Sequence, residues 1–249
     1  MIDILKHNWK FPSETVYIIG TGHNGKDHYG RIPFDAWTIG VNKAIQLQSN
    51  DAVEHSPDIR ERMENAEAAN PDKPCIPISI WLCADTTLPE EDWFKSEVGT
   101  TIACEFPLDN NLNPTPVFST SPNEDIALTT VYPDVPYYFT HGYSLRERPA
   151  FVPLEGMLRA GGSISAQAIQ LAYWLGAKRI ILVGVDMAGK TYFDDTENSN
   201  PNLKADGTSK HLRMTQGLCD WLLAEGIEII SLSETALKVT YDYTKQQIH

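Results

Sequence analysis

Cysteine is scarce in this sequence, and long hydrophobic runs are missing. The 249 residues include four cysteines, which lie far apart and form no C-x-x-C pair. This spacing fits neither a disulfide scaffold nor a zinc knuckle, so we expect reduced thiols in the core of a cytoplasmic protein. No stretch approaches the roughly 20 apolar residues of a membrane helix. The first residues, Met1 to His7, lack the charged-then-apolar pattern of a secretion signal.

Basic residues are also in short supply. The sequence holds 20 Lys and Arg against 33 Asp and Glu, which gives a formal net charge of −13. Proteins that scan nucleic acids and polybasic membrane-surface proteins both need a surplus of cations, so this charge disfavours both classes. With 42% hydrophobic residues, the chain has enough apolar content for one large domain over residues 1–249.

Three runs in the first third of the chain predict buried strands. Residues 15–20 (TVYIIG) contain β-branched and aromatic residues without polar alternation, and residues 36–41 and 76–83 form two further runs. Strands of this kind are typical of a sheet that is covered on both faces. Residues 58–70, rich in Glu, Arg and Ala, predict an exposed helix that ends before Pro71.

The last third of the chain repeats the order helix, short turn, strand. Residues 165–175 have apolar side chains at helical spacing, Gly176 ends the segment, and an apolar run follows over 180–186. The same order recurs with a helix over 212–225 and a strand over 227–232, again separated by a glycine. Glycine just after a helix is typical of a left-handed C-terminal cap. Helices that alternate with buried strands predict an α/β fold with a mostly parallel sheet.

Residues 106–153 have a different composition. They hold eight of the sixteen prolines, together with many Asn, Ser and Thr residues. Proline fixes φ and removes a donor, so regular structure here is expected to be short. Two interpretations stay open: a surface excursion, or an irregular lid or insertion over a site.

A glycine-rich turn follows the first predicted strand. Residues 20–25 (GTGHNG) satisfy the G-x-G-x-x-G pattern of dinucleotide-binding proteins. Residues 26–33 predict a poor helix, however, and the second strand ends in Asn42 where an acid should bind the ribose, so the pattern disfavours NAD. A close approach to a phosphate or ribose and a tight turn without a ligand both stay open. On the first reading, the binding residues of the turn are Gly20, Gly22, His23 and Asn24.

Polar residues also end three of the predicted strands. Asn42 can read a base or sugar with its amide, or it can cap a helix over 43–48. Asp85 and Asp186 can bind a metal, a sugar hydroxyl or a backbone amide, or cap a helix. In open α/β sheets ligands bind beyond the carboxyl ends of the strands, where these side chains are expected.

A second phosphate candidate is the segment Gly161-Gly162-Ser163-Ile164-Ser165. Paired glycines and hydroxyls at the start of a helix present unpaired amides that favour an anion, with Arg159 just before them. His211, at the predicted start of the last helix, is a candidate general base near neutral pH. Tyr192 follows the strand that ends in Asp186 and is placed to donate its hydroxyl to a phosphate.

The order of these motifs resembles a known Rossmann-like superfamily. The shared features are the glycine turn, the strand ending in Val-Asn, the Gly-Gly-Ser helix, Leu-Gly-Ala-Lys and Ile-Leu-Val-Gly-Val-Asp-Met. The superfamily includes bacterial lipooligosaccharide sialyltransferases and archaeal 6-hydroxymethylpterin diphosphokinase-like proteins. The resemblance runs over residues 16–44 and 161–237 and implies a three-layer sandwich. The usual Pro-Ser after the glycine turn is His23-Asn24 here.

The resemblance also implies roles for the motif residues. In the sialyltransferase branch the glycine turn and the asparagine hold the nucleotide, which matches Gly20, Gly22 and Asn42. A serine at the later helix start matches Ser163 or Ser165. The phosphate-contacting tyrosine resembles Tyr192, and the histidine base resembles His211.

The leading hypothesis is therefore transfer of a sugar from a nucleotide-activated donor to a hydroxyl of a glycan or other alcohol, with no obligatory metal. The first alternative is diphosphate transfer from ATP to a pterin-like alcohol, with Mg²⁺ held by Asp85 or Asp186. The second is a nucleotide-binding module without catalysis. The sequence does not decide whether the chain forms a homo-oligomer.

Overall fold

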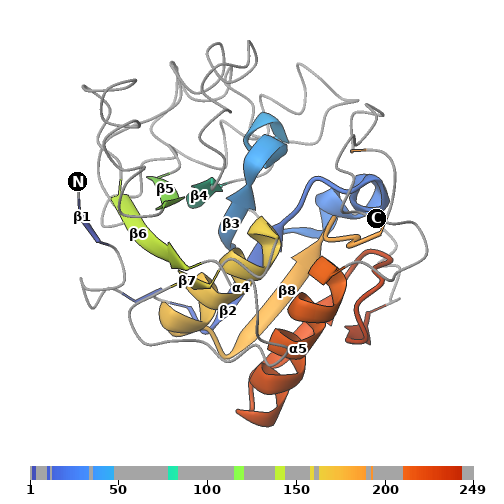
Figure 1. The fold of residues 1–249 in the computed structure, drawn as a ribbon. Helices are drawn as coiled ribbons and strands as arrows, with labels where there is room; N and C mark the ends of the chain where they lie inside the picture. Colours follow the sequence, from blue (N-terminus) through green and yellow to red (C-terminus); the bar gives the residue numbers. More distant parts are fainter. Residues whose placement is uncertain are drawn as a thin grey trace.

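The computed structural model describes residues 2–3, 10–11, 13–33, 36–47, 78–83, 115–120, 138–143, 158–159, 163–188, 192 and 210–242. Within them, ten strands form one sheet in which all neighbouring strands run parallel (Figure 1). The spatial order is β1 (Ile2–Asp3), β6 (Tyr138–Tyr143), β5 (Thr115–Thr120), β4 (Ile80–Cys83), β3 (Trp37–Val41), β2 (Thr15–Ile19), β8 (Arg179–Val183), β9 (Glu228–Ser231) and β10 (Thr240–Tyr241), and β7 (Leu158–Arg159) pairs with β6.

The strand order reverses at β2. From β2 the chain adds β3, β4, β5 and β6 on one side, and it then returns to add β8, β9 and β10 on the other side. In the register of the central pair, Ile18 of β2 lies opposite Leu182 of β8. Such a reversal is the topological switch point of a doubly wound sheet. The predicted Rossmann-like α/β fold with a parallel sheet is confirmed.

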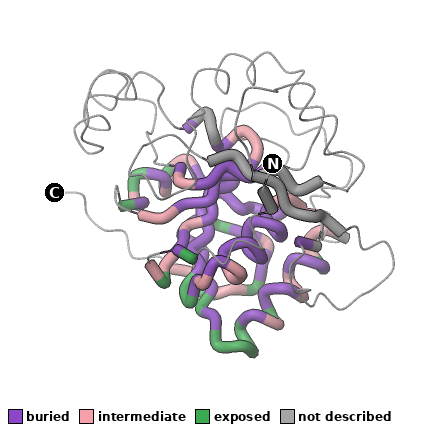
Figure 2. The backbone as a smooth tube through the Cα atoms, turned by 90° about the vertical axis from the view of Figure 1, so that its left-hand side faces the viewer, coloured by how far each residue is buried: buried purple, intermediate pink, exposed green. Residues whose placement is uncertain are grey.

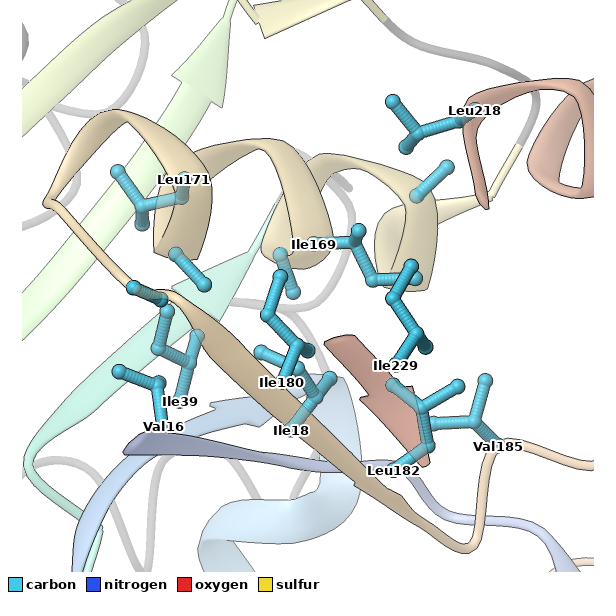
Figure 3. Close-up of a cluster of buried hydrophobic side chains, with 14 of the residues drawn as sticks. Val16, Ile18, Ile39, Ile169, Leu171, Ile180, Leu182, Val185, Leu218 and Ile229 are labelled. Carbon is cyan, nitrogen blue, oxygen red and sulfur yellow. The ribbon is translucent and has the colours of Figure 1, made fainter. Parts of the chain in front are cut away.

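Two α-helices cover one face of this sheet. They are α4 (Ile164–Trp174) and α5 (Lys210–Ala224), which pack against each other. Alternate residues of the central strands point toward α4 and form the main core, with Ile18 and Leu182 below Ile169 and Leu171 (Figure 3). This alternation follows from the two-residue period of a strand.

The opposite face of the sheet is covered as well. The residues that alternate with the main core, Ile19, Ile181 and Val183, are also buried. Figure 2 shows that buried residues make up most of the centre of the described backbone. The 3-10 helix η2 (His23–Arg31) contributes Tyr29 to this opposite face, and the 3-10 helix η3 (Asn42–Leu47) follows β3. Both faces are therefore buried, as the apolar runs predicted.

The helix ends agree with the sequence. Gly176 and Gly226 follow α4 and α5 with φ values of +99° and +82°, in the left-handed region expected for C-terminal caps. Ser163 is the N-cap of α4, because its hydroxyl accepts from the Ser165 amide at 3.2 Å. This N-cap settles which serine begins the helix.

Several predictions need correction or fall outside the description. Residues 26–33 were expected to form a poor helix, which agrees with the structure: η2 covers them as far as Arg31 with 3-10 turns instead of an α-helix. The strand predicted over 180–186 ends at Val183, because Gly184 has a φ of +67° and turns the chain. The predicted helix over 58–70 lies outside the described residues.

The proline-rich segment 106–153 contains two strands of the central sheet. These strands, β5 and β6, are six residues each, which agrees with short regular structure. They extend the sheet rather than form an excursion from it, and the rest of the segment, including any lid, lies outside the described residues. Cys219 is buried and free, as expected, whereas Cys75 and Cys104 lie outside the description. The described helices include none with the length and apolar character needed to span a membrane.

Candidate functional site

The glycine turn after β2 is bonded to the chain leaving β8. The Gly20 amide donates to the Val183 carbonyl at 2.8 Å, and the Gly22 amide donates to the Gly184 carbonyl at 2.8 Å. These bonds continue the pairing of the two central strands past their ends. The turn therefore lies at the switch point, where open α/β sheets bind ligands.

Asp186 connects three chain segments at this point. Its Oδ2 accepts from the Asn24 amide at 3.0 Å, and its carbonyl accepts from the Ala236 amide at 2.9 Å. The Asn24 side-chain amide in turn donates to the Glu234 carbonyl at 3.1 Å. Only 8% of Asp186 is exposed, and its Oδ1 is buried without a hydrogen-bond partner. A buried carboxylate oxygen without a partner destabilises the folded chain unless a proton, a hydrogen-bond donor or a cation binds to it.

The carboxylate of Asp186 fills the space directly above Gly22. A Cβ built on Gly22 would lie 2.2 Å from the carboxyl carbon of Asp186 and 2.4 Å from each of its oxygens. Any side chain at residue 22 would have to displace this group. The glycine is thus required by the approach of the chain's own carboxylate.

Burial raises the pKa of Asp186 to about 6, because desolvation disfavours the charged form. The Asn24 amide and the nearby His23 oppose this rise, and Glu234 adds to it. Asp186 is therefore largely ionised above pH 7, at a higher energetic cost than an exposed aspartate.

Tyr29 supports the turn from the η2 side. Its hydroxyl donates to the Gly20 carbonyl at 2.9 Å, and the side chain is 2% exposed. Burial, with a contribution from the charge of Asp186, raises the pKa of Tyr29, so the phenol stays protonated as a donor. This hydrogen bond fixes the backbone of the turn where it leaves β2.

Asn42 lies at the carboxyl end of the neighbouring strand β3. Its φ of +48° is in the left-handed region, and its carbonyl accepts from the Trp81 indole at 2.7 Å. The side-chain oxygen Oδ1 is buried and has no hydrogen-bond partner. Asn42 is the first residue of η3. Because the side-chain oxygen has no partner, the structure favours a role of Asn42 in binding a ligand over a role as a helix cap alone.

Tyr192 reaches the turn from the segment after β8. Its backbone forms an isolated antiparallel bridge with Gly22, and its ring lies under the Lys43 ammonium, with Nζ 5.0 Å from the ring centroid. Sequence reasoning missed Lys43. The available signal was its position immediately after Asn42, which puts it at the same strand end.

The start of α4 joins the same region. The Ser163 hydroxyl lies 3.9 Å from the sulfur of Met187, the residue after Asp186, and Met187 has a φ of +57°. Ser165 is buried inside the first turn of α4. Gly161 and Gly162 lie outside the described residues, so their predicted role in phosphate binding stays a prediction.

His211 lies in the first turn of α5. In a parallel strand-helix-strand unit the helix runs opposite to the strands, so α5 begins at the carboxyl edge of the sheet (Figure 1). His211 is half-buried, and its carbonyl accepts from the Thr215 hydroxyl at 2.9 Å. The contacts above join Gly22, Asn24, Asp186 and Tyr192 directly, whereas His211 is placed by its edge of the sheet.

The other predicted positions can now be located. His23 is exposed at the start of η2, beside Asp186. Asp85 lies outside the described residues. Within the part of the chain that the structure describes, no group of three or more His, Cys, Asp or Glu side chains is arranged to hold a metal ion.

Comparison with known proteins gives a remote likeness in fold. No protein-family model matches the chain, and no curated protein matches it. Among solved structures, the sialyltransferase CstII from Campylobacter jejuni in complex with cytidine-5'-monophosphate is 13% identical, with a TM-score of 0.43 over 88% of this chain and 79% of that chain. CstII in complex with CMP-3FNeuAc is 12% identical, with a TM-score of 0.42 over 92% and 88%. The fold assignment rests on the strand order above.

Proposed function

We propose that this chain is a transferase that binds a nucleotide-activated donor at the switch point between β2 and β8. In the leading form the transferred group is a sugar, and the acceptor is a hydroxyl of a glycan or another alcohol. The donor is a substrate, and no cofactor or metal is obligatory in this reaction.

This proposal rests on the convergence of separate chain segments at one place, the carboxyl edge of the sheet between β2 and β8, which we call the rim. The glycine turn, Asp186 and Tyr192 meet through hydrogen bonds and a backbone bridge. Four buried side-chain polar atoms in the described residues have no partner: two of them, on Asn42 and Asp186, belong to the segments that follow β3 and β8, and the other two, on Gln167 and Trp174, lie on α4. Both non-glycine residues with positive φ in the described chain, Asn42 and Met187, belong to the segments that follow β3 and β8. Orphan polar atoms and backbone outliers gather at functional sites because a ligand compensates for them.

The reaction requires a base, a site for the acceptor and stabilisation of the leaving group. His211 would take the proton of the acceptor hydroxyl, whose oxygen attacks the anomeric carbon of the donor sugar. The bond between that carbon and the phosphate oxygen breaks, and its electron pair leaves with the nucleotide. The Tyr192 hydroxyl and the start of α4 at Ser163 would stabilise the charge on the departing phosphate.

The test is a transfer assay with the full chain. CMP-sialic acid and a galactoside are mixed with the protein, release of CMP is followed, and other nucleotide sugars are then offered one by one. His211→Asn should reduce turnover about 100-fold or more, with nucleotide binding unchanged, since general bases contribute roughly 10²–10⁴-fold. His28→Asn, on η2, serves as the matched control. Absence of turnover with every nucleotide sugar argues against the transferase.

One observation favours the diphosphokinase as a second candidate. A carboxylate oxygen without a partner, such as Oδ1 of Asp186, is a ligand that Mg²⁺ prefers. Activity with ATP and a pterin alcohol that is abolished by EDTA and restored by Mg²⁺ would select this candidate. A thermal shift with CMP, CDP or ATP, without product in either assay, would instead identify a binding module without catalysis.

A further inference from the structure

We propose that the phosphate of the bound ligand lies against Lys43 and Tyr192, and that the glycine turn does not hold it. The inference rests on the proposed function only in taking the ligand to be a nucleotide. It assigns a specific binding role to Lys43.

The first argument is that four backbone amides of the turn already donate to acceptors of the chain itself. The amides of Gly20, Gly22 and Asn24 donate to Val183, Gly184 and Asp186. The Gly25 amide donates to the Gly22 carbonyl at 3.1 Å. A Rossmann phosphate needs amides that are unpaired before the ligand arrives. These four donors would each have to break an internal bond first.

The second argument is that a negatively charged group, the carboxylate of Asp186, already occupies the turn. The carboxylate of Asp186 accepts from an amide in the first turn of η2 and touches Gly22, which is where a phosphate would rest on a glycine-rich turn. A phosphate at that place would meet a buried carboxylate at contact distance, and like charges in a poorly solvated site repel strongly. Asp186 therefore acts as an internal substitute for the phosphate.

The third argument is that a cation is held next to the turn. The Lys43 ammonium lies over the Tyr192 ring, 5.0 Å from its centroid, and the Tyr192 backbone pairs with Gly22. A cation–π contact orients the ammonium and limits the conformations of its long side chain. The unpartnered Oδ1 of Asn42, the preceding residue, adds an acceptor for a donor group of the same ligand. In a chain with a net charge of −13, a fixed lysine at the binding rim provides local attraction for a phosphate.

The experiment compares ligands with and without phosphate. Isothermal titration uses the 5'-monophosphates of cytidine, uridine, adenosine and guanosine, each against its own nucleoside, and pyrophosphate as a separate probe. Lys43→Met should weaken nucleotide and pyrophosphate binding about 10- to 100-fold and leave nucleoside binding unchanged, whereas Lys43→Arg should retain most of the affinity. Tyr192→Leu should also weaken nucleotide and pyrophosphate binding, because it removes both the ring below the ammonium and the hydroxyl that we place against the phosphate.

The control is Lys178→Met, which removes the same charge from an exposed lysine at the opposite edge of the sheet, just before β8. Nucleotide binding that is equally tight in Lys43→Met and in the control overturns the inference and leaves the proposed function standing. Pyrophosphate binding that depends on Lys43, without binding of any nucleotide, supports the phosphate site at Lys43 and overturns both the nucleotide as its ligand and the proposed function. Absence of binding by every probe overturns both.

Discussion

The substitution Asp186→Asn should stabilise the folded chain at neutral pH. The pKa of this carboxyl is raised from 3.8 to about 6 in the folded protein. Since one pKa unit corresponds to about 1.4 kcal/mol, keeping Asp186 ionised in the folded state costs about 3 kcal/mol. Asparagine carries no charge and retains an oxygen that can accept from the Asn24 amide. Its extra N–H group needs a partner of its own, so the expected gain at pH 7.5 is about 1–3 kcal/mol.

The sign of the pH dependence follows from proton binding. Between pH 3.8 and about 6 the folded wild type holds a proton on Asp186 that the unfolded chain has lost. The stability contributed by this group is present below pH 3.8 and is lost as the pH rises through about 6. The advantage of the variant should therefore be small at pH 4.5 and should reach its full value above pH 7.

Urea unfolding followed by tryptophan fluorescence at pH 4.5, 6.0 and 7.5 measures this difference. Other carboxylates titrate in both proteins, so their contributions cancel in the comparison. Asp27→Asn, on the exposed side of η2, is the control and should change stability little at every pH. A variant that is no more stable than wild type at pH 7.5, or an advantage that is independent of pH, would refute the assignment of a strained buried carboxylate.

Three further predictions concern the surroundings of this carboxylate and the core. Gly22→Ala should destabilise the chain by about 1–3 kcal/mol, because its Cβ would overlap the carboxyl group of Asp186, and adding Asp186→Ala should restore part of the loss in a thermal melt. Tyr29→Phe should cost about 1 kcal/mol in urea unfolding, since the Gly20 carbonyl loses its donor, and an unchanged midpoint would speak against that bond. Burial raises the pKa of the Cys219 thiol to about 12, so peptide mapping after iodoacetamide treatment at pH 8 should find it unmodified in the folded chain and modified in urea; labelling of the native protein at this residue would contradict the burial.

Much of the fold could be predicted from local sequence patterns. The apolar runs at 15–20 and 180–186 become the central strands, and Gly176 and Gly226 end α4 and α5 as expected. These features depend on burial and on backbone conformation, which a short stretch of sequence largely determines. The strand in 115–120 was less visible, because neighbouring prolines and polar residues hide a short strand that tertiary pairing stabilises.

The site was harder to predict than the fold. Gly22, Asp186 and Tyr192 were each named from their places at strand ends, and the structure brings them together. The sequence could not show that Asp186 would fill the glycine turn, because that contact joins residues far apart and depends on how β8 ends. Lys43 was missed for a related reason, since its cation–π partner comes from a remote segment.

The reversal of strand order at β2 also decides when the rim can form. Asn24 and Asp186, whose contact closes the rim, are 162 residues apart in the sequence. The pairing of β2 with β8 has a high contact order, and loops of this length close late in folding. During synthesis on the ribosome, β2 must wait for most of the polypeptide before its second neighbour emerges. A nascent chain stalled before β8 thus carries the glycine-rich sequence without the partner that gives it its shape.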